Sequence, residues 1–485
     1  MSLTKLSTYD VVVVGSGAAG QAAALTAVEH GNQVLMLEKG RHTGGSANYS
    51  EGLFAVDSYL QKKQGIDVST IDVLQEEVEY SKYKADSRIW RKYLDASAEN
   101  VQWLHDEGVK YEGVQAMGAG EATWHIYEGF GDAVMHKALQ PKFKKLGGEL
   151  LTSVSAIDLE ICRRGKKKIT LKSEADGQTE TVTAKVVILA AGGYLNNSEM
   201  MAHDTDYDLT RLVTVSSGKG TGDGLRLGWQ VGGQKAGMGM AMLFGGYLKD
   251  PEEPSFKMMN SQMNVAAGQQ PLLWVNENGE RFVDESVIYN FSYAGNALYS
   301  QNSVYSILDQ KNITEMIEKG NFMGLGVYVK RGQKMTHLQD EIDQALIDNK
   351  PFIFKADTIE NLAKEMNLPQ EKLTKTIGQY NQFVENGEDQ FFGKDSQYLR
   401  SVEKGPFYGF KLSVGAFCTM GGLKVTPDNE LEDKYGKPIS GIYATGNDAA
   451  GLTGDTYCPN MPGTCAGYAF YSGRNAAQHA QRYLQ

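Results

Sequence analysis

The chain has 485 residues, of which 41% are hydrophobic and 22% charged, a composition typical of ordinary globular proteins. This length exceeds what one hydrophobic core organises, so we expect two or three domains. The formal net charge of −11 argues against nucleic acids and anionic membranes as partners.

The ends of the chain and the cysteines predict where the protein works. Residues 1–10 contain no apolar segment typical of a signal peptide, and no run of 18 apolar residues predicts a membrane span. The cysteines show no spacing typical of a disulfide scaffold, a zinc site, a cluster or a c-type haem; they are Cys162, Cys418, Cys458 and Cys465. We therefore expect a cytoplasmic protein with no membrane span and no metal.

The first motif occupies the N-terminal 38 residues. Residues 9–14 predict a buried strand, and the pattern G-x-G-x-x-G, which begins at Gly15, predicts a turn into a helix over residues 18–29. A second strand over residues 33–38 ends at Glu38. Such glycines permit a tight turn, close approach of a pyrophosphate and helix–strand packing, while the acid accepts hydrogen bonds from a ribose. Strand, glycines, helix, strand and acid in this order predict a dinucleotide site.

Later segments alternate between helix-like and strand-like patterns. Predicted helices cover residues 67–107, 131–145, 221–228, 335–386 and 467–483, and predicted strands cover 150–160, 168–172, 184–193 and 441–448. Asn278-Gly279 predicts a hairpin within residues 272–284. The glycine-rich loops stop near residue 241 and return after residue 417, so the two ends of the chain are expected to build one domain and the middle a second, inserted one.

Together these motifs resemble the FAD-dependent fumarate reductase/succinate dehydrogenase flavoprotein family, which includes soluble fumarate reductases, urocanate reductases and 3-ketosteroid dehydrogenases. The resemblance covers nearly the whole chain and rests on residues 11–20, 38–39, 44–45, 188–193, 221–224, 279–285, 419–422, 441–446 and 473–474. It implies an α/β protein with a doubly wound, Rossmann-like FAD-binding domain and an inserted α+β capping domain. The FAD-binding domain would comprise residues 1–240 and 418–485, and the capping domain residues 241–417.

The resemblance also implies the residues that bind the cofactor. Members with covalent FAD carry a histidine near the position of Ser46; this chain has none at that point, which implies non-covalent FAD. The implied FAD-binding residues are Gly15, Ser16, Gly17, Ala19 and Gly20 at the pyrophosphate; Glu38, followed by Lys39, at the adenosine ribose; Gly45, Ser46, Ala47 and Gly52 along the pyrophosphate and flavin; Val154 at the adenine; Ala190, Ala191, Gly192 and Asp223 beside the dinucleotide; Gly446 and Asn447 at the ribityl chain; and Thr464, Cys465 and Ala466 at the pyrimidine edge of the flavin.

The family reaction transfers a hydride between flavin N5 and one carbon of a C–C bond, while a side chain moves a proton at the neighbouring carbon. In fumarate reductases the resemblance assigns that proton to the arginine of a G-x-R-F-x-x-E motif, which is Arg281 here. Arginine rarely gives up its proton, because its pKa lies above about 12, but a neighbouring carbanion is more basic still. The alternative is a surface arginine on the hairpin that pairs with Glu285 or Asp284.

Three further anchors of fumarate reductases are absent. Phe417 and Cys418 stand where the family has a histidine before T-M-G-G, residues 460–464 replace an arginine segment, and residues 243–245 replace another histidine. Apolar or neutral groups thus replace the partners of a carboxylate. Desolvating an unpaired carboxylate costs several kcal/mol, so we predict a substrate other than a simple dicarboxylate.

Several other residues have two readings. Tyr457 is a second candidate acid or an ordinary packed aromatic residue, and His125 is a substrate ligand or, more commonly in proteins, a structural histidine. Cys418 and Cys458 line a pocket or act as small buried hydrophobic residues. The basic run 163–168 predicts a solvated hairpin tip rather than a nucleic-acid patch.

Three functions stay open at this point. The first is an ene-reductase that passes a hydride from reduced FAD to an activated C=C bond of a small unsaturated molecule. The second is a desaturase, similar to ketosteroid dehydrogenases, that works in the opposite direction. The third is a flavin protein that only transfers electrons. The chain shows no second dinucleotide motif, so a reductase would draw its electrons from a separate reductase, from reduced flavin or from NAD(P)H.

Overall fold

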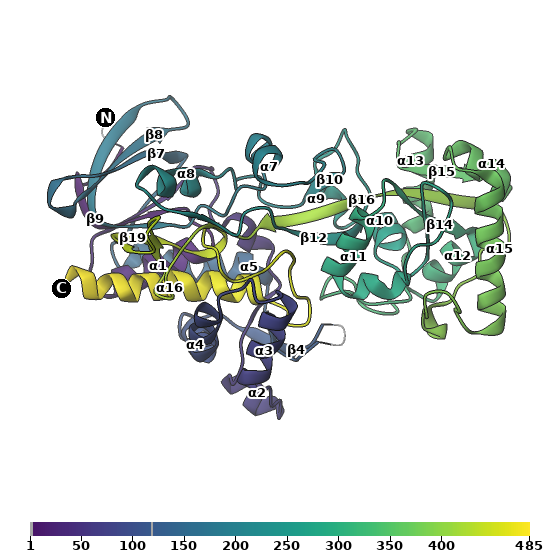
Figure 1. The fold of residues 1–485 in the computed structure, drawn as a ribbon, viewed down its shortest axis with the longest axis horizontal. Helices are drawn as coiled ribbons and strands as arrows, with labels where there is room; N and C mark the ends of the chain where they lie inside the picture. Colours follow the sequence, from purple (N-terminus) through teal and green to yellow (C-terminus); the bar gives the residue numbers. More distant parts are fainter. Residues whose placement is uncertain (1–2, 118–119) are drawn as a thin grey trace. The chain divides into compact units, whose positions relative to one another are not determined.

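The computed structural model describes residues 3–117 and 120–485. This chain divides into two compact units, whose elements are labelled in Figure 1. Unit 1 consists of Met1–Tyr207, Ser216–Met242 and Cys418–Gln485, and unit 2 of Asp208–Val215 and Leu243–Phe417. The second unit therefore includes a short segment, residues 208–215, that the sequence patterns had placed with the first.

Unit 1 is built on a sheet whose central strands are parallel. The strand order is β18-β19-β9-β1-β2-β6, and β1 pairs in parallel with both β2 and β9. The antiparallel pair β7–β8 extends it from β9. The strands are β1 (Thr8–Val14), β2 (Val34–Glu38), β6 (Glu149–Thr152), β7 (Val154–Ile161), β8 (Lys167–Ser173), β9 (Thr179–Leu189), β18 (Glu430–Glu432) and β19 (Pro438–Ala444). The apolar strand β1 is central, as its valine run predicts.

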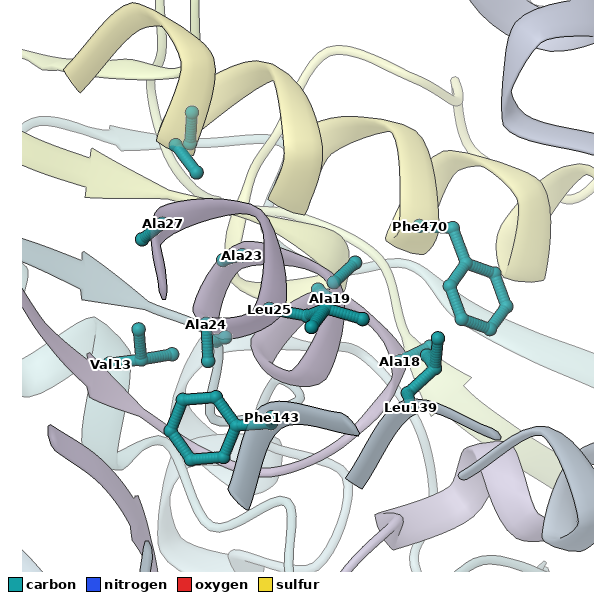
Figure 2. Close-up of a cluster of buried hydrophobic side chains, with 14 of the residues drawn as sticks. Val13, Ala18, Ala19, Ala23, Ala24, Leu25, Ala27, Leu139, Phe143 and Phe470 are labelled. Atoms are coloured by element: carbon teal, nitrogen blue, oxygen red, sulfur yellow. The ribbon is translucent and has the colours of Figure 1, made fainter. Parts of the chain in front are cut away.

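Two helices from opposite ends of the sequence pack beside this sheet. Helix α1 (Ala18–Glu29) lies against α16 (Thr464–Leu484), and Figure 2 shows Phe470 of α16 and Phe143 on opposite sides of α1. The helices approach so closely that a Cβ on Gly473 would lie 2.2 Å from the Ala19 carbonyl oxygen, so only glycine fits at this position. Residues 18–28 of α1 are all buried, and the helix agrees with the one predicted over residues 18–29.

The other elements of unit 1 surround this core. The strands are β3 (Gly52–Phe54), β4 (Tyr111–Gln115) and β5 (Trp124–Tyr127), which form one sheet, and the pair β11 (Lys235–Ala236) and β17 (Gly422–Leu423). The helices are η1 (Gly45–Tyr49), α2 (Tyr59–Gln64), α3 (Thr70–Tyr80), α4 (Ser87–Asp106), α5 (Phe130–Ala133), η2 (Val134–Leu139), α6 (Gln140–Lys145), η3 (Arg163–Gly165), α7 (Ser198–Asp204), α8 (Asp223–Gln230) and η6 (Gly446–Asp448). Among the described residues no helix combines the length and apolarity that a bilayer crossing requires.

Unit 2 is organised around the long strand β16. Its neighbours are β10, β12, β14 and β15, and β13 pairs with β14. The strands are β10 (Leu212–Thr214), β12 (Ala241–Tyr247), β13 (Leu273–Asn276), β14 (Val304–Asp309), β15 (Ile353–Ala356) and β16 (Phe407–Thr419). The helices are α9 (Ser255–Met258), α10 (Gln262–Gly268), η4 (Glu285–Tyr289), α11 (Phe291–Tyr299), α12 (Gln310–Glu318), α13 (Leu338–Ile347), α14 (Ile359–Glu365), α15 (Gln370–Asn386) and η5 (Ser396–Tyr398).

The hairpin predicted within residues 272–284 is wrong in its second half. The turn exists, since Gly279 has a φ of 71° and the Asn276 amide donates to the Glu280 carbonyl at 2.9 Å. The residues after it form no strand, and β13 pairs with the distant β14 instead. Arg281, two residues after Gly279, makes ion pairs with Glu285 and Asp389.

Candidate functional site

The three glycines of the first motif have different surroundings in the structure. Gly15 has a φ of +110°, which favours glycine, and a Cβ there would lie 2.2 Å from the Ala190 carbonyl oxygen. A Cβ on Gly20 would lie 1.9 Å from the Gly15 carbonyl oxygen. Gly17 differs, because the nearest atom to its Cβ would be 3.8 Å away. Gly15 and Gly20 are therefore needed for the turn and the packing, whereas the space above Gly17 is open.

The N-terminus of α1 beside Gly17 is suited to an anion. No side chain caps it, and its first turn carries no acidic residue. The amides of a first helical turn lack partners within the helix and carry the positive end of its dipole. Gly45, in η1, borders the same space, since a Cβ on Gly45 would lie 3.7 Å from the Gly17 Cα. This cradle has the space and the free helix amides that the predicted pyrophosphate site requires.

Glu38 lies at the end of β2 and is 5% exposed. Its Oε2 accepts a 2.5 Å hydrogen bond from the Ser16 hydroxyl, and its Oε1 accepts one of 2.7 Å from the Gly40 amide. Lys219 Nζ lies 3.5 Å from Oε1. The carboxylate is thus held in place beside the glycine turn, and each oxygen retains acceptor capacity for a ribose hydroxyl.

Two residues predicted to contact the cofactor are paired with each other. Lys39 Nζ lies 2.8 Å from Asp223 Oδ2, and it also donates to Thr221. Asp223 further pairs with Arg226. Lys39 and Asp223 could contact a cofactor only while also keeping these ion pairs. Their mutual ion pair joins the end of β2 to the start of α8.

Asp448 is a site residue that the sequence reasoning missed. It is fully buried, and its oxygens accept hydrogen bonds from the amides of Ala191 at 2.7 Å and Gly193 at 2.8 Å. Burial raises the pKa of Asp448 to about 6, against the effect of these hydrogen bonds. The sequence analysis assigned the ribityl chain to Gly446 and Asn447, and Asp448 is the next residue along the chain.

The predicted flavin end gathers around the N-terminus of α16. Thr464, Cys465 and Ala466 form its first turn, whose N-cap Gly463 contributes no side chain. The Cys465 thiol lies 3.4 Å from Asn447 Oδ1, in η6, and Cys465 lies beside the Tyr457 hydroxyl and influences its pKa. The structure therefore brings predicted ribityl-binding and pyrimidine-binding residues together with the second candidate acid.

The remaining predicted cofactor residues lie at other edges of the same unit. Ser46 accepts a 3.1 Å hydrogen bond from the Ser217 amide, and Ala47 is next to it in η1. Gly52 begins β3, and Val154 begins β7, where it pairs with Ser173. Gly192 has a φ of +88° in the loop after β9. The loops after β1, β2, β9 and β19 all leave carboxyl ends of parallel strands, the usual location of ligand sites in such sheets.

Tyr457 is 3% exposed, and the buried acid Glu77 lies near it. Burial, with the Cys465 thiol and Glu77 nearby, raises the pKa of Tyr457 well above its usual value. Burial also raises the pKa of Glu77, although a hydrogen bond with Cys458 opposes this. Tyr457 therefore keeps its proton at neutral pH, in unit 1.

Arg281 lies in unit 2 and is enclosed by acids and rings. Its Nε and Nη2 donate to Glu285 at 2.9 and 2.8 Å, and its Nη1 and Nη2 donate to Asp389 at 3.0 and 2.9 Å. Its guanidinium lies over the rings of Tyr380 and Phe392, at 4.9 and 5.0 Å from their centroids. Burial lowers the pKa of Arg281, but the hydrogen bonds to Glu285 and Asp389 outweigh it and raise this pKa above its ordinary value. These contacts count against the predicted role of Arg281 as proton donor and favour the paired alternative, in a buried rather than an exposed position.

His125 has the contacts of a structural residue. It is 0% exposed, its Nε2 lies 2.6 Å from the Ser58 hydroxyl and its Nδ1 lies 3.0 Å from the Thr123 carbonyl oxygen. Burial lowers the pKa of His125 to about 4. These partners fit a neutral ring whose Nδ1 donates and whose Nε2 accepts, so His125 is not directed at a substrate.

The basic run 163–168 forms the predicted turn between β7 and β8, with one departure. Arg163 and Arg164 are exposed, but Lys167 is buried and donates to the Lys185 carbonyl at 2.7 Å. Burial lowers the pKa of Lys167 to about 8. The prediction that the whole run 163–168 is solvated is therefore wrong for Lys167.

The cysteines divide as the sequence suggested. Cys418 and Cys458 are buried, and all four cysteines are free thiols. Contact with Cys465, together with burial, raises the pKa of Cys418 well above its usual value. Cys418 thus lies among the predicted flavin-binding residues, while Cys458 contacts Glu77.

Comparison with known proteins identifies the class. Residues 10–458 match the family model described as FAD binding domain, and the chain belongs to this family. It is an α/β FAD-dependent oxidoreductase, as the sequence predicted.

The chain is 68% identical over 484 residues to vinyl phenol reductase of Lactiplantibacillus plantarum, a match covering 100% of this chain and 98% of that protein. It is 25% identical over 450 residues to NADH:fumarate oxidoreductase of Klebsiella pneumoniae, covering 92% of this chain but 45% of that protein. Among solved structures, 3-ketosteroid delta1-dehydrogenase from Sterolibacterium denitrificans matches with a TM-score of 0.79 at 20% identity, over 99% of this chain and 100% of that one. The predicted function is confirmed at this level: the chain reduces a C=C bond of a substrate other than a simple dicarboxylate.

Proposed function

We propose that the chain reduces the vinyl group of a vinyl phenol to an ethyl group. The observation that carries this proposal is the 68% identity, over both full lengths, to a vinyl phenol reductase. The exchange of carboxylate anchors for Phe417, Cys418 and the apolar segment 243–245 supports a substrate without carboxylates. The alternative function, a desaturase, is supported only by the fold. The ketosteroid dehydrogenase shares the fold of this chain but only 20% of its sequence.

FAD, once bound and reduced by the electron donor, would supply the hydride. The open space above Gly17, the uncapped N-terminus of α1 and the held carboxylate of Glu38 support binding of its dinucleotide part in unit 1. The residues at positions 44–47 are glycine, serine and alanine, which supports non-covalent attachment. We infer that the first turn of α16 holds the flavin end.

The reaction also needs a proton, and Tyr457 is the acid we propose. Its hydroxyl keeps the proton at neutral pH, and it contacts Cys465, one of the residues proposed to hold the flavin. Arg281 is less suited, because four of its hydrogen bonds are already made to two carboxylates. Tyr457→Phe, which removes only the hydroxyl, should lower kcat at least tenfold and leave FAD binding unchanged.

The electrons come from a separate donor: a reductase, free reduced flavin or NAD(P)H. A cytoplasmic location is the one we propose, since all four cysteines are free thiols and disulfides belong to oxidising compartments.

The test is anaerobic. The protein carrying FAD is reduced with dithionite, and flavin reoxidation is followed after addition of 4-vinylphenol, fumarate or urocanate. We expect rapid reoxidation by 4-vinylphenol with formation of 4-ethylphenol, and slow reoxidation by the two acids. Rapid reoxidation by fumarate without any by 4-vinylphenol would contradict the proposal.

A further inference from the structure

Two aromatic side chains of unit 2 stack on each other. Phe244 of β12 and Phe417 of β16 have ring centroids 4.2 Å apart and an interplanar angle of 15°. Phe291, at the start of α11, meets Phe417 edge to face, at 6.2 Å and 68°. Phe244 is 5% exposed, whereas Phe291 and Phe417 are partly exposed. The cluster thus has a buried base and two rings that reach the surface.

A glycine in β16 makes room for this stack. A Cβ on Gly415 would lie 2.1 Å from Cζ of Phe244, so the absence of a side chain at Gly415 leaves room for the Phe244 ring. The residues that pack around the rings are Val213, Val215, Tyr247, Met258 and Met259. Methionine adapts its shape to neighbouring rings and makes favourable sulfur–aromatic contacts.

The side chains of the cluster determine which kind of ligand it can bind. Its members are aliphatic, aromatic or thioether side chains, so a carboxylate placed among them would lose its hydration without gaining a charged partner. A flat aryl ring instead gains burial and offset or edge-to-face contacts with the existing rings. The cluster therefore fits an uncharged aromatic ring and disfavours fumarate.

Chain connectivity relates the stack to the proposed flavin end. Phe417 is directly followed by Cys418, whose thiol contacts Cys465 and Asn447 of unit 1. Phe244 lies two residues after Met242, the other point at which this part of the chain changes units. One peptide bond thus joins a stacked ring to a residue that touches the proposed flavin-binding residues.

We propose that Phe244, Phe291 and Phe417 form the subsite that binds the aryl ring of the substrate. The proposal rests on the proposed function, since it places the ring of a vinyl phenol. Stacking holds the ring, and the vinyl group is the part left to react.

The experiment measures binding of 4-ethylphenol, the saturated product, to the protein carrying FAD by isothermal titration calorimetry, together with KM and kcat for 4-vinylphenol. Phe417→Leu and Phe291→Leu keep an apolar side chain but remove the ring. Each should raise the Kd and the KM about five- to tenfold, and should change kcat less. Phe417→Tyr, which restores a ring, should recover most of the affinity.

The matched control is Phe354→Leu. Phe354 is a partly buried ring of the same unit that meets Tyr305 at 6.1 Å in another cluster, so its loss should leave Kd and KM unchanged. A second ligand, 4-ethylcyclohexanol, has the same outline without the π system. The wild-type protein should bind it more weakly than 4-ethylphenol, and the leucine variants should bind the two ligands alike.

Unchanged Kd and KM in folded Phe417→Leu and Phe291→Leu would overturn the subsite, while turnover of 4-vinylphenol by the wild-type protein would leave the proposed function standing. If the wild-type protein neither reduces 4-vinylphenol nor binds 4-ethylphenol, the proposed function and the subsite fall together.

Discussion

Arg281 and Glu285 are joined side by side, with Nε donating to Oε1 at 2.9 Å and Nη2 donating to Oε2 at 2.8 Å, and the Glu285 side chain is 0% exposed. Lys394 adds a second cation at 3.1 Å from Glu285, and Asp389 a second anion beside Arg281. Two positive and two negative groups thus balance one another inside unit 2.

The first prediction follows from this balance. Arg281→Ala leaves Glu285 and Asp389 with Lys394 as the remaining cation, so we expect the free energy of unfolding to fall by about 3–5 kcal/mol. Chemical denaturation of the variant and the wild-type protein measures the loss. Arg281→Lys keeps the charge but cannot form the paired hydrogen bonds, and it should be destabilised by less.

The same variants separate structure from catalysis. If Arg281 is structural, the fraction of Arg281→Lys that folds and holds FAD should turn over at a rate close to that of the wild-type protein. A stable, FAD-loaded Arg281→Lys without turnover would restore arginine as the proton donor.

The second prediction concerns His125. The unfolded chain binds a proton at this residue below pH 6.5, whereas the native state does so only below about pH 4. The free energy of unfolding should therefore decrease as the pH falls from 6.5 to 4, by about 3 kcal/mol from this residue. Urea unfolding at several pH values should show that His125→Gln loses this dependence.

The third prediction has the opposite sign. The native state holds a proton on Asp448 up to about pH 6, whereas the unfolded chain releases it near 3.8. The free energy of unfolding should thus decrease as the pH rises from 3.8 to 6, by about 3 kcal/mol from this residue. Asp448→Asn removes that slope, so the variant should lose stability more steeply than the wild-type protein when acidified. Parallel pH profiles for the two proteins would disprove the assignment.

The fourth prediction uses the two neighbouring glycines. A Cβ fits at Gly17, where the nearest atom is 3.8 Å away, but not at Gly20, where the Gly15 carbonyl oxygen is 1.9 Å away. Gly17→Ala should keep the melting temperature of the apoprotein and raise the Kd of FAD at least tenfold, because the methyl group occupies the proposed pyrophosphate position. Gly20→Ala should unfold or melt much lower. Unchanged FAD affinity in Gly17→Ala would mean that the cofactor does not use this cradle.

Features encoded within a few neighbouring residues were predictable from the sequence. The strand, the glycine turn and α1 follow one another over residues 8–29, and Gly20 has a local steric reason, since a Cβ there would lie 1.9 Å from the Gly15 carbonyl oxygen. Of the ion pairs of Arg281, the one with Glu285, four residues away, was foreseen as an alternative. The one with Asp389 was not, because 108 residues separate the partners and no local pattern marks them.

Long-range pairing also explains the other errors. Nothing near Leu212–Thr214 predicts that this three-residue strand pairs with β16. The sequence analysis therefore placed the segment in the FAD-binding domain, whereas the structure groups it with unit 2. The turn at Gly279 was correctly predicted, but no local pattern marks that β13 pairs with the distant β14 and that no strand follows the turn. Phe244 and Phe417 were each recognised as apolar replacements, and only the fold shows that they meet.

The short strand β10 has a practical consequence for dissecting the protein. It pairs with Val414, Gly415 and Ala416 of β16, and its Val213 packs in the same cluster as Phe244. A fragment made only of residues 243–417 would lack this strand, exposing an unpaired edge and part of the aromatic cluster, and such edges aggregate. Producing unit 2 as an independent module requires grafting residues 208–215 onto the fragment through a designed linker, so that a peptide distant in sequence closes the sheet.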